Sequence, residues 1–191
     1  MVRRGALGCA FEIVQTLVLT ILIFVVVQTF VAQPYRVEQG SMEHTLEPDQ
    51  YVLVDKLTPR FDGYNRGDIV VFTPPDTFAS DGTPFIKRVI GLPGETIDVR
   101  SDGFIYVDGT KLDERYLFEG QPTPAAAGRD HWTVPAGEVF VMGDHREASS
   151  DSRVFGPIPE TSIIGRAWLR YWPLPLFGVL GTPPYPALAA R

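Results

Sequence analysis

One long apolar run, residues 11–32, constrains this chain more than any other feature. As a helix it is about 33 Å long, close to the roughly 30 Å hydrocarbon thickness of a bilayer. A cleaved export leader has a shorter apolar region followed by a small-residue cleavage site, and no clear site of that kind precedes Tyr35. We therefore predict one retained transmembrane helix over residues 11–32, with Glu12 at the level of the headgroups.

The charges beside this run predict its orientation. Arg3 and Arg4 flank the N-terminal end, whereas Arg36 and Glu38 cancel on the other side. By the positive-inside rule, residues 1–10 are cytoplasmic and the chain after the span is extracytoplasmic.

The outer part of the chain, residues 33–191, is acidic and has no cysteine, because the sole cysteine is Cys9. The whole sequence has 17 Lys+Arg and 23 Asp+Glu, a net charge of −6. This balance argues against nucleic acid as a partner and against a broad electrostatic grip on anionic lipid. Without disulfides, one domain stabilised by its own packed core is expected.

Short segments rich in β-branched and aromatic residues predict a mainly antiparallel, partly barrel-like β-domain anchored by the helix. Asp102-Gly103 and Asp108-Gly109 are typical of tight turns. A non-periodic loop at residues 119–130 and its neighbouring hairpins predict a small cap around 99–136, and the Pro-rich chain after 172 predicts an irregular edge with a frayed end. Strands are expected at 51–57, 68–72, 85–92, 104–107, 138–144 and 163–172.

Ser41, in the stretch GSMEHTL, is a candidate nucleophile within about 35 Å of the bilayer, so its substrate is expected to be membrane-bound. A serine hydroxyl near neutral pH needs an adjacent base and donors for the oxyanion. Lys87 in FIKRVIGL lies among apolar residues, where burial favours the neutral amine that acts as a base. The strand alone leaves open a solvated lysine that protects a sheet edge.

A third polar block, GDHREASSDSR, occupies residues 143–153. Together with GSMEHTL, RGDIVVF and IKRVIGLPGE in this order, it resembles the GSMxPTL, RGD, KRVxGxPGD and GDNRxxSxDSR patterns of bacterial type I signal peptidases. The resemblance extends from the membrane helix to about Trp172. It implies a single-pass serine endopeptidase of the bacterial cell membrane. Such an enzyme cleaves signal peptides from exported precursor proteins after small-x-small sites and needs no metal or organic cofactor.

The resemblance also implies roles for individual residues. Ser41 becomes the acylating nucleophile and Lys87 the general base, and Ser149 hydrogen-bonds to the Lys87 amine. Gly40 precedes the Ser41 backbone N–H that faces the oxyanion, and Met42 packs beside the dyad.

The remaining implied residues support the site or contact the substrate. Asp151 pairs with Arg153 or Arg146 and holds the Ser149 loop, and an extended substrate pairs along the strand of Lys87. Shallow apolar pockets would exclude bulky side chains. The residues expected to line these pockets are Val37, Leu46, Phe85 and Ile86.

Three positions depart from the family pattern. His44 replaces a proline, His145 replaces an asparagine, and Gln39 stands where relatives have a small residue that adds an oxyanion donor. The Gln39 amide is able to donate, but its longer side chain loses more entropy on ordering.

Two other kinds of site remain open from the sequence. A Ser/His/Asp triad would use His44, His131 or His145 as the base and Asp144 or Asp151 to orient it. A metal site would use Asp144, His145 and Asp151.

Further alternatives concern the activity as a whole. One alternative is a membrane-tethered domain that binds exported peptides without cutting them. Another is a Ser/Lys processing peptidase with a narrow substrate. Tyr35, Phe61 and Trp172 are candidates for seating the domain at the bilayer, since amphipathic rings favour interfaces. The loop sequence AAAG, residues 125–128, satisfies the small-x-small rule and suggests self-cleavage after Ala127.

Overall fold

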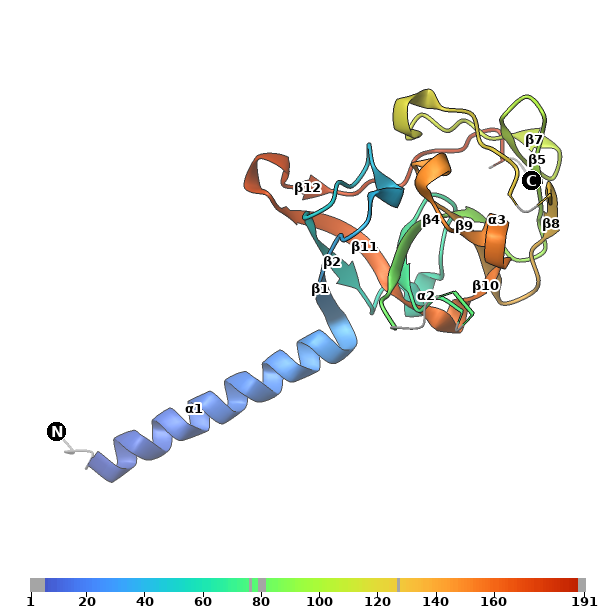
Figure 1. Cartoon of the computed structure of the whole chain (residues 1–191). Coiled ribbons are helices and arrows are strands. Elements are labelled where there is room, and N and C mark those ends of the chain that lie inside the picture. The colour runs from blue at the N-terminus through green and yellow to red at the C-terminus, as the bar shows by residue number, and fades with distance from the viewer. Residues whose placement is uncertain (1–5, 76, 79–81, 127, 189–191) are drawn as a thin grey trace.

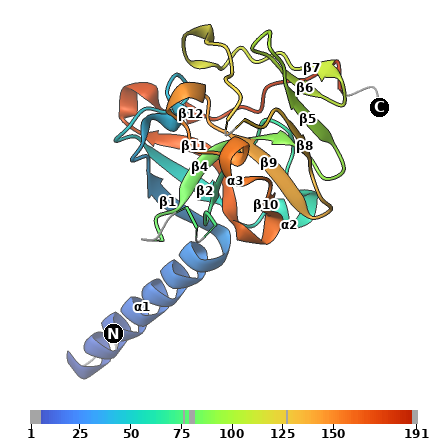
Figure 2. The same cartoon turned by 45° about the vertical axis from the view of Figure 1, so that its right-hand side comes forward.

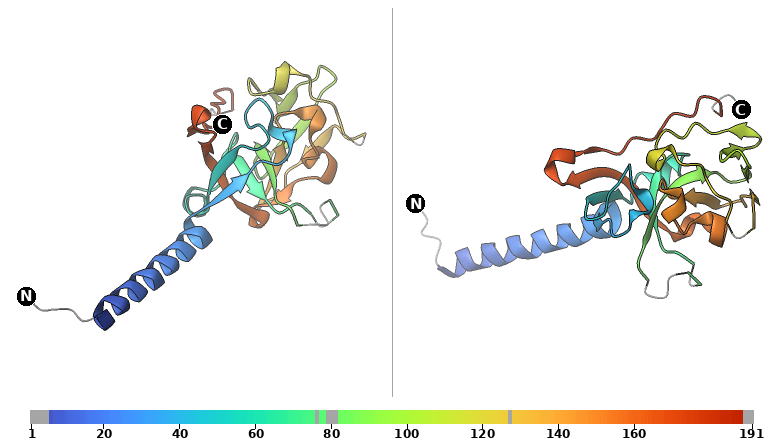
Figure 3. Two further views of the ribbon diagram at one scale, coloured as in Figure 1. Left: turned by 60° about the vertical axis from the view of Figure 1, so that its left-hand side comes forward. Right: turned by 45° about the horizontal axis from the view of Figure 1, so that its top comes forward.

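The expected apolar helix forms and stands apart from the rest of the chain, but it begins before residue 11 and ends before Ala32, which is the first residue of a strand. The computed structural model describes residues 6–75, 77–78, 82–126 and 128–188. Helix α1 (Ala6–Val26) continues into a π-helical turn, η1 (Val27–Val31). By length and composition Gly8–Val31 is able to cross a membrane, with a mean hydropathy of 2.5. Figure 1 shows α1 projecting away from the β-domain, and both views of Figure 3 agree.

All described strand pairs are antiparallel, and most strands belong to one large curled sheet (Figures 1 and 2). Its order is β1-β2-β11-β3-β4-β9-β10, with β12 added to β11. This arrangement confirms the predicted mainly antiparallel β-fold. The strands are β1 (Ala32–Arg36), β2 (Tyr51–Asp55), β3 (Ile69–Phe72), β4 (Phe85–Gly91), β9 (Glu138–Met142), β10 (Ile158–Pro159), β11 (Ile163–Trp172) and β12 (Gly178–Val179).

A second sheet of four strands, in the order β7-β6-β5-β8, lies at the end of the domain far from α1 (Figure 1). Asp108 and Gly109, with φ of 48° and 77°, form the tight turn between β6 and β7, because Val107 pairs with Thr110. The predicted hairpin turn is therefore present. The strands are β5 (Thr96–Val99), β6 (Ile105–Val107), β7 (Thr110–Lys111) and β8 (His131–Thr133).

Short helical turns connect the strands. The two α-helical turns are α2 (Pro59–Asp62) and α3 (Ser152–Phe155). The 3-10 turns are η2 (Gly40–Met42), η3 (Phe118–Gly120), η4 (Arg146–Ala148), η5 (Glu160–Ser162) and η6 (Leu174–Leu176).

Burial on both faces explains the uninterrupted apolar sequence of β3. Ile69 and Val71 join one buried cluster with Met42 and Leu46, whereas Val70 and Phe72 join another. A strand with only one buried face would alternate apolar and polar residues. A third cluster fills the space between the two sheets. It includes Ile97, Ile105 and Trp132 from the small sheet and Phe140 and Met142 from β9.

The C-terminal segment packs against the domain through residue 188, so the predicted irregular edge is ordered, and the last residues, 189–191, lie outside the described chain. The Thr182 hydroxyl donates to Asp68 Oδ1 at 2.8 Å, and the hydroxyls of Tyr185 and Tyr116 lie 3.2 Å apart. Tyr185 and Leu188 pack against the cluster between the sheets. Proline-rich sequence lacks periodicity, but its apolar side chains still bury surface.

Two sequence predictions fall on residues that the structure does not describe. Arg3 and Arg4, which predict the orientation of the helix, precede the described chain. Ala127, the proposed self-cleavage position, also lies outside the described residues.

Candidate active site

The structure brings Ser41 and Lys87 into direct contact. Ser41 lies on η2, shortly after β1, and Lys87 lies on β4. The Lys87 amine Nζ donates to Ser41 Oγ at 2.8 Å and to Ile86 O at 3.0 Å. Only 3% of Ser41 and 1% of Lys87 is exposed. Lys87 is therefore not the solvated lysine of a sheet edge, which the sequence alone leaves open.

Burial changes the protonation of Lys87. Removal from water lowers the pKa of its amine from 10.5 to about 8, and the nearby carboxylates of Asp151 and Asp144 oppose this shift. A buried lysine with a bidentate carboxylate partner would keep its charge. In this geometry the Lys87 amine instead loses its proton slightly above neutral pH. The neutral amine that results is the form able to accept a proton from a serine hydroxyl.

Asp151 is the centre of a buried polar group behind this pair. Arg153 binds it through Nε to Oδ1 at 2.8 Å and through a terminal nitrogen to Oδ2 at 2.9 Å. The Ser149 hydroxyl donates to Asp151 Oδ2 at 2.7 Å. Within the described chain, the expected hydrogen bond between Ser149 and Lys87 is not formed. A carboxylate two residues away is the stronger acceptor for the hydroxyl.

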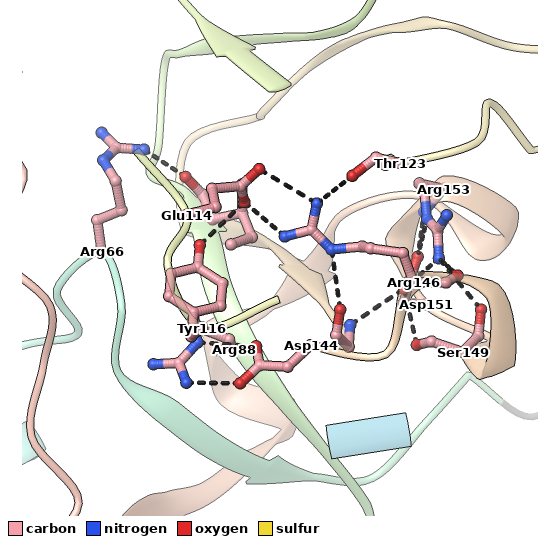
Figure 4. Close-up of polar contacts among 12 residues, drawn as sticks. Arg66, Arg88, Glu114, Tyr116, Thr123, Asp144, Arg146, Ser149, Asp151 and Arg153 are labelled. Atoms are coloured by element: carbon pink, nitrogen blue, oxygen red, sulfur yellow. Dashed lines mark hydrogen bonds and ion pairs between the residues drawn. The ribbon is translucent and has the colours of Figure 1, made fainter. Parts of the chain in front are cut away.

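Arg146 has a different partner from Arg153, as Figure 4 shows. It pairs with Glu114 from the segment after β7, and it donates to Thr123 Oγ1 at 2.5 Å. Its Nε also donates to Gly143 O at 2.9 Å. Of the two arginines expected for Asp151, Arg153 is therefore the partner, and Arg146 ties the site to the region of the small sheet.

The pair of Arg88 and Asp144 was missed by sequence reasoning. Arg88 binds both carboxylate oxygens of Asp144, at 2.9 and 2.6 Å, and stacks on the Tyr116 ring at 4.1 Å. Thr45 donates to the same carboxylate at 2.5 Å. Successive residues of a strand point to opposite faces, so Arg88 reaches this carboxylate while Lys87 reaches Ser41. Two adjacent basic residues inside a buried strand were the available signal.

Gly143 allows the loop after β9 to approach Ser41. A Cβ at this position would lie 2.4 Å from both Ser149 Oγ and the Ser41 carbonyl oxygen. The Gly143 N–H donates to Asp151 Oδ2 at 3.1 Å, and the His145 N–H donates to Ser41 O at 3.1 Å. The loop after β9 thus contacts the backbone carbonyl of Ser41 and fixes its position.

The histidines do not assemble a triad with Ser41. His145 Nδ1 lies 2.8 Å from Glu43 Oε2, and its ring stacks on Phe118 with centroids 4.1 Å apart. His131 pairs with Asp98 in the small sheet at 2.6 Å, and His44 is exposed. In the described chain, no imidazole hydrogen-bonds to Ser41 Oγ.

The alternative metal site is not assembled either. Its two carboxylates, Asp144 and Asp151, bind Arg88 and Arg153, and His145 faces Glu43. Among the described residues, no three His, Cys, Asp or Glu side chains converge as metal ligands would.

A cavity of about 200 Å³ opens beside Ser41 between β1 and the start of β4. Val37, Phe85 and Ile86 line it as expected. Leu46 does not line it and is fully buried in the cluster with Met42, so this assignment is wrong. A leucine shortly after the nucleophile is drawn into the core by its apolar surface. The lining residues are Pro34, Tyr35, Arg36, Val37, Glu38, Gln39, Ser41, Val52, Val71, Thr83, Pro84, Phe85, Ile86 and Lys87.

Comparisons with known proteins match this chain along most of its length. A family model described as signal peptidase, peptidase S26, matches residues 10–172. The chain is 39% identical over 175 residues to probable signal peptidase I-1 of Synechocystis sp., covering 90% of this chain and 87% of that protein. It is 38% identical over 177 residues to signal peptidase I of Leptolyngbya laminosa, covering 91% and 85% of the two chains.

More distant matches carry the same family name. Signal peptidase IB of Staphylococcus aureus is 32% identical over 181 residues, covering 87% of this chain and 91% of that protein. A crystal structure of a signal peptidase I from Enterococcus faecalis is 34% identical, with a TM-score of 0.42, and covers 54% of this chain and 95% of that one. The family match over residues 10–172 confirms the expected membership: the chain belongs to the signal peptidases, peptidase S26.

Proposed function

We propose that this protein is a membrane-anchored serine endopeptidase that cleaves signal peptides from exported precursor proteins by a Ser/Lys dyad. The contact that carries the proposal is the 2.8 Å hydrogen bond between the buried Lys87 amine and Ser41 Oγ. The signal-peptidase names of the relatives support the substrate class.

The proposed reaction begins with neutral Lys87. It accepts the proton of Ser41 Oγ as that oxygen attacks the carbonyl carbon of the scissile bond. The protonated amine then returns a proton to the leaving nitrogen, and an acyl-enzyme on Ser41 remains. Lys87 next takes a proton from the water that attacks the ester carbon. It returns that proton to Ser41 Oγ as the ester bond breaks, so the signal peptide leaves as a carboxylic acid and the serine hydroxyl and neutral amine are restored.

The oxyanion requires donors fixed in advance. The Ser41 backbone N–H, which follows Gly40 in η2, is the proposed first donor. The Gln39 side chain lies at the same cavity, is exposed, and makes no cap hydrogen bond to η2. Its amide is the proposed second donor, ordered when substrate binds.

The cavity supports binding of an extended peptide. The pairing of β4 with β9 covers Arg88–Gly91, so β4 residues 85–87 line the cavity on one side and β1 lies on the other. An extended substrate would bind between these two strands by backbone hydrogen bonds. The branched side chains of Val37 and Ile86 line this cavity, and pockets lined in this way favour small substrate side chains by excluding bulky ones, which supports cleavage after small-x-small sites.

The proposed location is the bacterial cell membrane. Residues 11–31 span the bilayer, residues 1–10 are cytoplasmic, and residues 32–191 form the extracytoplasmic catalytic domain with a small cap around 99–136. Phe61 and Trp172 are 83% and 50% exposed, which supports their contact with lipid. Tyr35 instead lines the cavity.

The test is cleavage of a synthetic precursor with an Ala-x-Ala site in lipid vesicles, with the products mapped by mass spectrometry. Wild type should cut after the second alanine, whereas Ser41→Ala and Lys87→Ala should not. Matched controls are Ser101→Ala and Lys111→Ala, both exposed residues, which should cut like wild type.

Three outcomes would contradict the proposal in different ways. A wild type that binds the precursor without cutting it would indicate a tethered binding domain. Loss of cleavage in His145→Ala, with activity kept in Lys87→Ala, would indicate a histidine base. Cleavage confined to one precursor in a panel would indicate a processing peptidase with a narrow substrate.

A further inference from the structure

The membrane helix leads directly into the strand that borders the active-site cavity. The π-helical turn ends at Val31, and β1 starts at the next residue, Ala32. The Ala32 N–H bonds back to Val27 O, and β1 pairs with β2 from Ala32 opposite Asp55 onward. The continuation of β1, from Pro34, lines the cavity. The end of the helix and one wall of the site are therefore a single ordered stretch of chain.

Lys56 joins the end of this helix to the domain a second time. Its amine Nζ donates to Gln28 O at 3.2 Å, Thr29 O at 3.4 Å and Gln33 Oε1 at 2.8 Å. Its backbone N–H donates to Val31 O at 2.9 Å. The last carbonyls of a helix have no intrahelical donor and carry partial negative charge. A lysine at this position satisfies both, so it holds the helix end against β2.

We propose that Lys56 is a positioning residue that fixes the height and tilt of the catalytic domain over the bilayer, and so selects the bond that is cut in a membrane-bound precursor. This inference rests on the proposed function. From Val31 to Ser41 the chain reaches at most about 35 Å. With a rigid junction, Ser41 stays at one level above the membrane.

A fixed level of Ser41 constrains the substrate. The apolar segment of a precursor lies in the same bilayer, so the length of chain from its end to the cut bond must match the level of Ser41. Side chains along α1 are exposed and leave its surface available to lipid or to that segment. A junction that swings would let Ser41 reach several neighbouring bonds.

The experiment uses full-length enzyme in phosphatidylcholine and phosphatidylglycerol vesicles. The precursor carries overlapping Ala-x-Ala sites at successive distances from its apolar segment. Wild type should release one dominant product. Lys56→Met keeps the side-chain length but removes the charged donor, and the fraction cut at other sites should rise about fivefold, as the loss of hydrogen bonds from a charged group suggests. Both enzymes should cut a short soluble peptide at equal rates.

Matched variants separate positioning from general damage. Lys56→Arg keeps a charged donor and should retain the wild-type product. Lys111→Met changes the other lysine outside the active site, which is exposed on β7, and should also retain it. A Gly-Gly insertion between Val31 and Ala32 loosens the same junction and should spread the products as Lys56→Met does.

The outcomes distinguish this inference from the proposed function. Identical product distributions for wild type and Lys56→Met would overturn the inference alone. If Lys56→Met lost as much activity on the soluble peptide as on the membrane-bound precursor, the inference would also be overturned, since the residue would then support the fold in general. A wild type that cuts neither substrate would overturn the proposed function and this inference with it.

Discussion

Lys87 and Arg88 are neighbours on one strand and both are buried, yet their surroundings shift their pKa values in opposite directions. Arg88 has a bidentate carboxylate in Asp144 and keeps its charge. Lys87 has only the Ser41 hydroxyl and the Ile86 carbonyl as hydrogen-bond partners among the described residues, and burial lowers its pKa to about 8. Burial without a hydrogen-bonded carboxylate therefore favours the neutral form of Lys87, whereas the carboxylate of Asp144 keeps Arg88 charged.

The largest effect is the expected loss of cleavage activity when Lys87 is replaced. Lys87→Met removes the proposed base but keeps an apolar stem, so cleavage of the Ala-x-Ala precursor should fall about 10⁴-fold. Single-turnover kinetics with mass-spectrometric detection would measure it. Lys111→Met is the control and should leave the rate unchanged. A loss of less than tenfold would show that Lys87 is not the base.

The next effect concerns stability on the Arg88 side. Arg88→Met leaves Asp144 buried without its ion-pair partner and should lower the free energy of unfolding by about 4 kcal/mol. Urea unfolding followed by tryptophan fluorescence would measure it. Arg115 pairs with Asp113 in an ion pair whose side chains are 90% and 62% exposed. Arg115→Met should therefore change stability by less than about 1 kcal/mol. Equal losses of stability in Arg88→Met and Arg115→Met would show that the buried ion pair contributes no more than the exposed one.

A third prediction concerns pH. The folded-state pKa of Lys87, about 8, is below its ordinary 10.5, so the folded protein binds fewer protons between these values. Burial of charged Lys87 therefore costs roughly 3 kcal/mol below pH 8, and this cost disappears as pH rises toward 10.5. Lys87→Met should be more stable than wild type at pH 7, and the difference should vanish near pH 10.5.

The same titration predicts the activity profile. In the proposed reaction the neutral amine is the active form, so kcat/KM for wild type should rise with pH and reach half its plateau near pH 8. Cleavage of a soluble peptide in overlapping buffers would measure the profile. A rate independent of pH between about 6 and 10 would argue against Lys87 as the base.

The smallest effect on activity and stability is expected in the loop after β9, which carries Asp144, the partner of Arg88, and contacts Ser41 through Gly143. Gly143→Ala would place Cβ 2.4 Å from the Ser41 carbonyl oxygen and from Ser149 Oγ. The overlap should lower stability by about 2 kcal/mol and also reduce the cleavage rate, because Ser41 must move. Gly181 has open space around its Cα, so Gly181→Ala is the matched control. Unchanged activity in Gly143→Ala would show that the loop does not position Ser41.

Much of this arrangement follows from patterns in the amino-acid sequence. The apolar run predicts α1, and the β-branched segments predict β2, β3, β4, β6, β9 and β11 within a few residues. The strands that were missed are short or begin with polar residues, such as β5 and β8. Alternation is hard to recognise over so few positions.

Site residues were predicted less evenly than strands. Ordered motifs pointed to Ser41 and Lys87, which the structure brings into contact. The same motifs placed Leu46 at the cavity and Ser149 against Lys87, yet Leu46 is in the core and Ser149 faces Asp151. A motif records which residues recur together, but the direction of each side chain depends on what packs around it.

The sequence by itself determined the long apolar helix, the antiparallel β class and the two residues, Ser41 and Lys87, that the fold brings into contact, because periodicity and motif order are local properties of the chain. Tertiary structure alone decided which buried charge has a partner. Asp144 lies 56 positions from Arg88, and Glu114 lies 32 from Arg146. Such pairs form only where the folded backbone brings two side chains together away from water, and the same burial lowers the pKa of Lys87 to about 8.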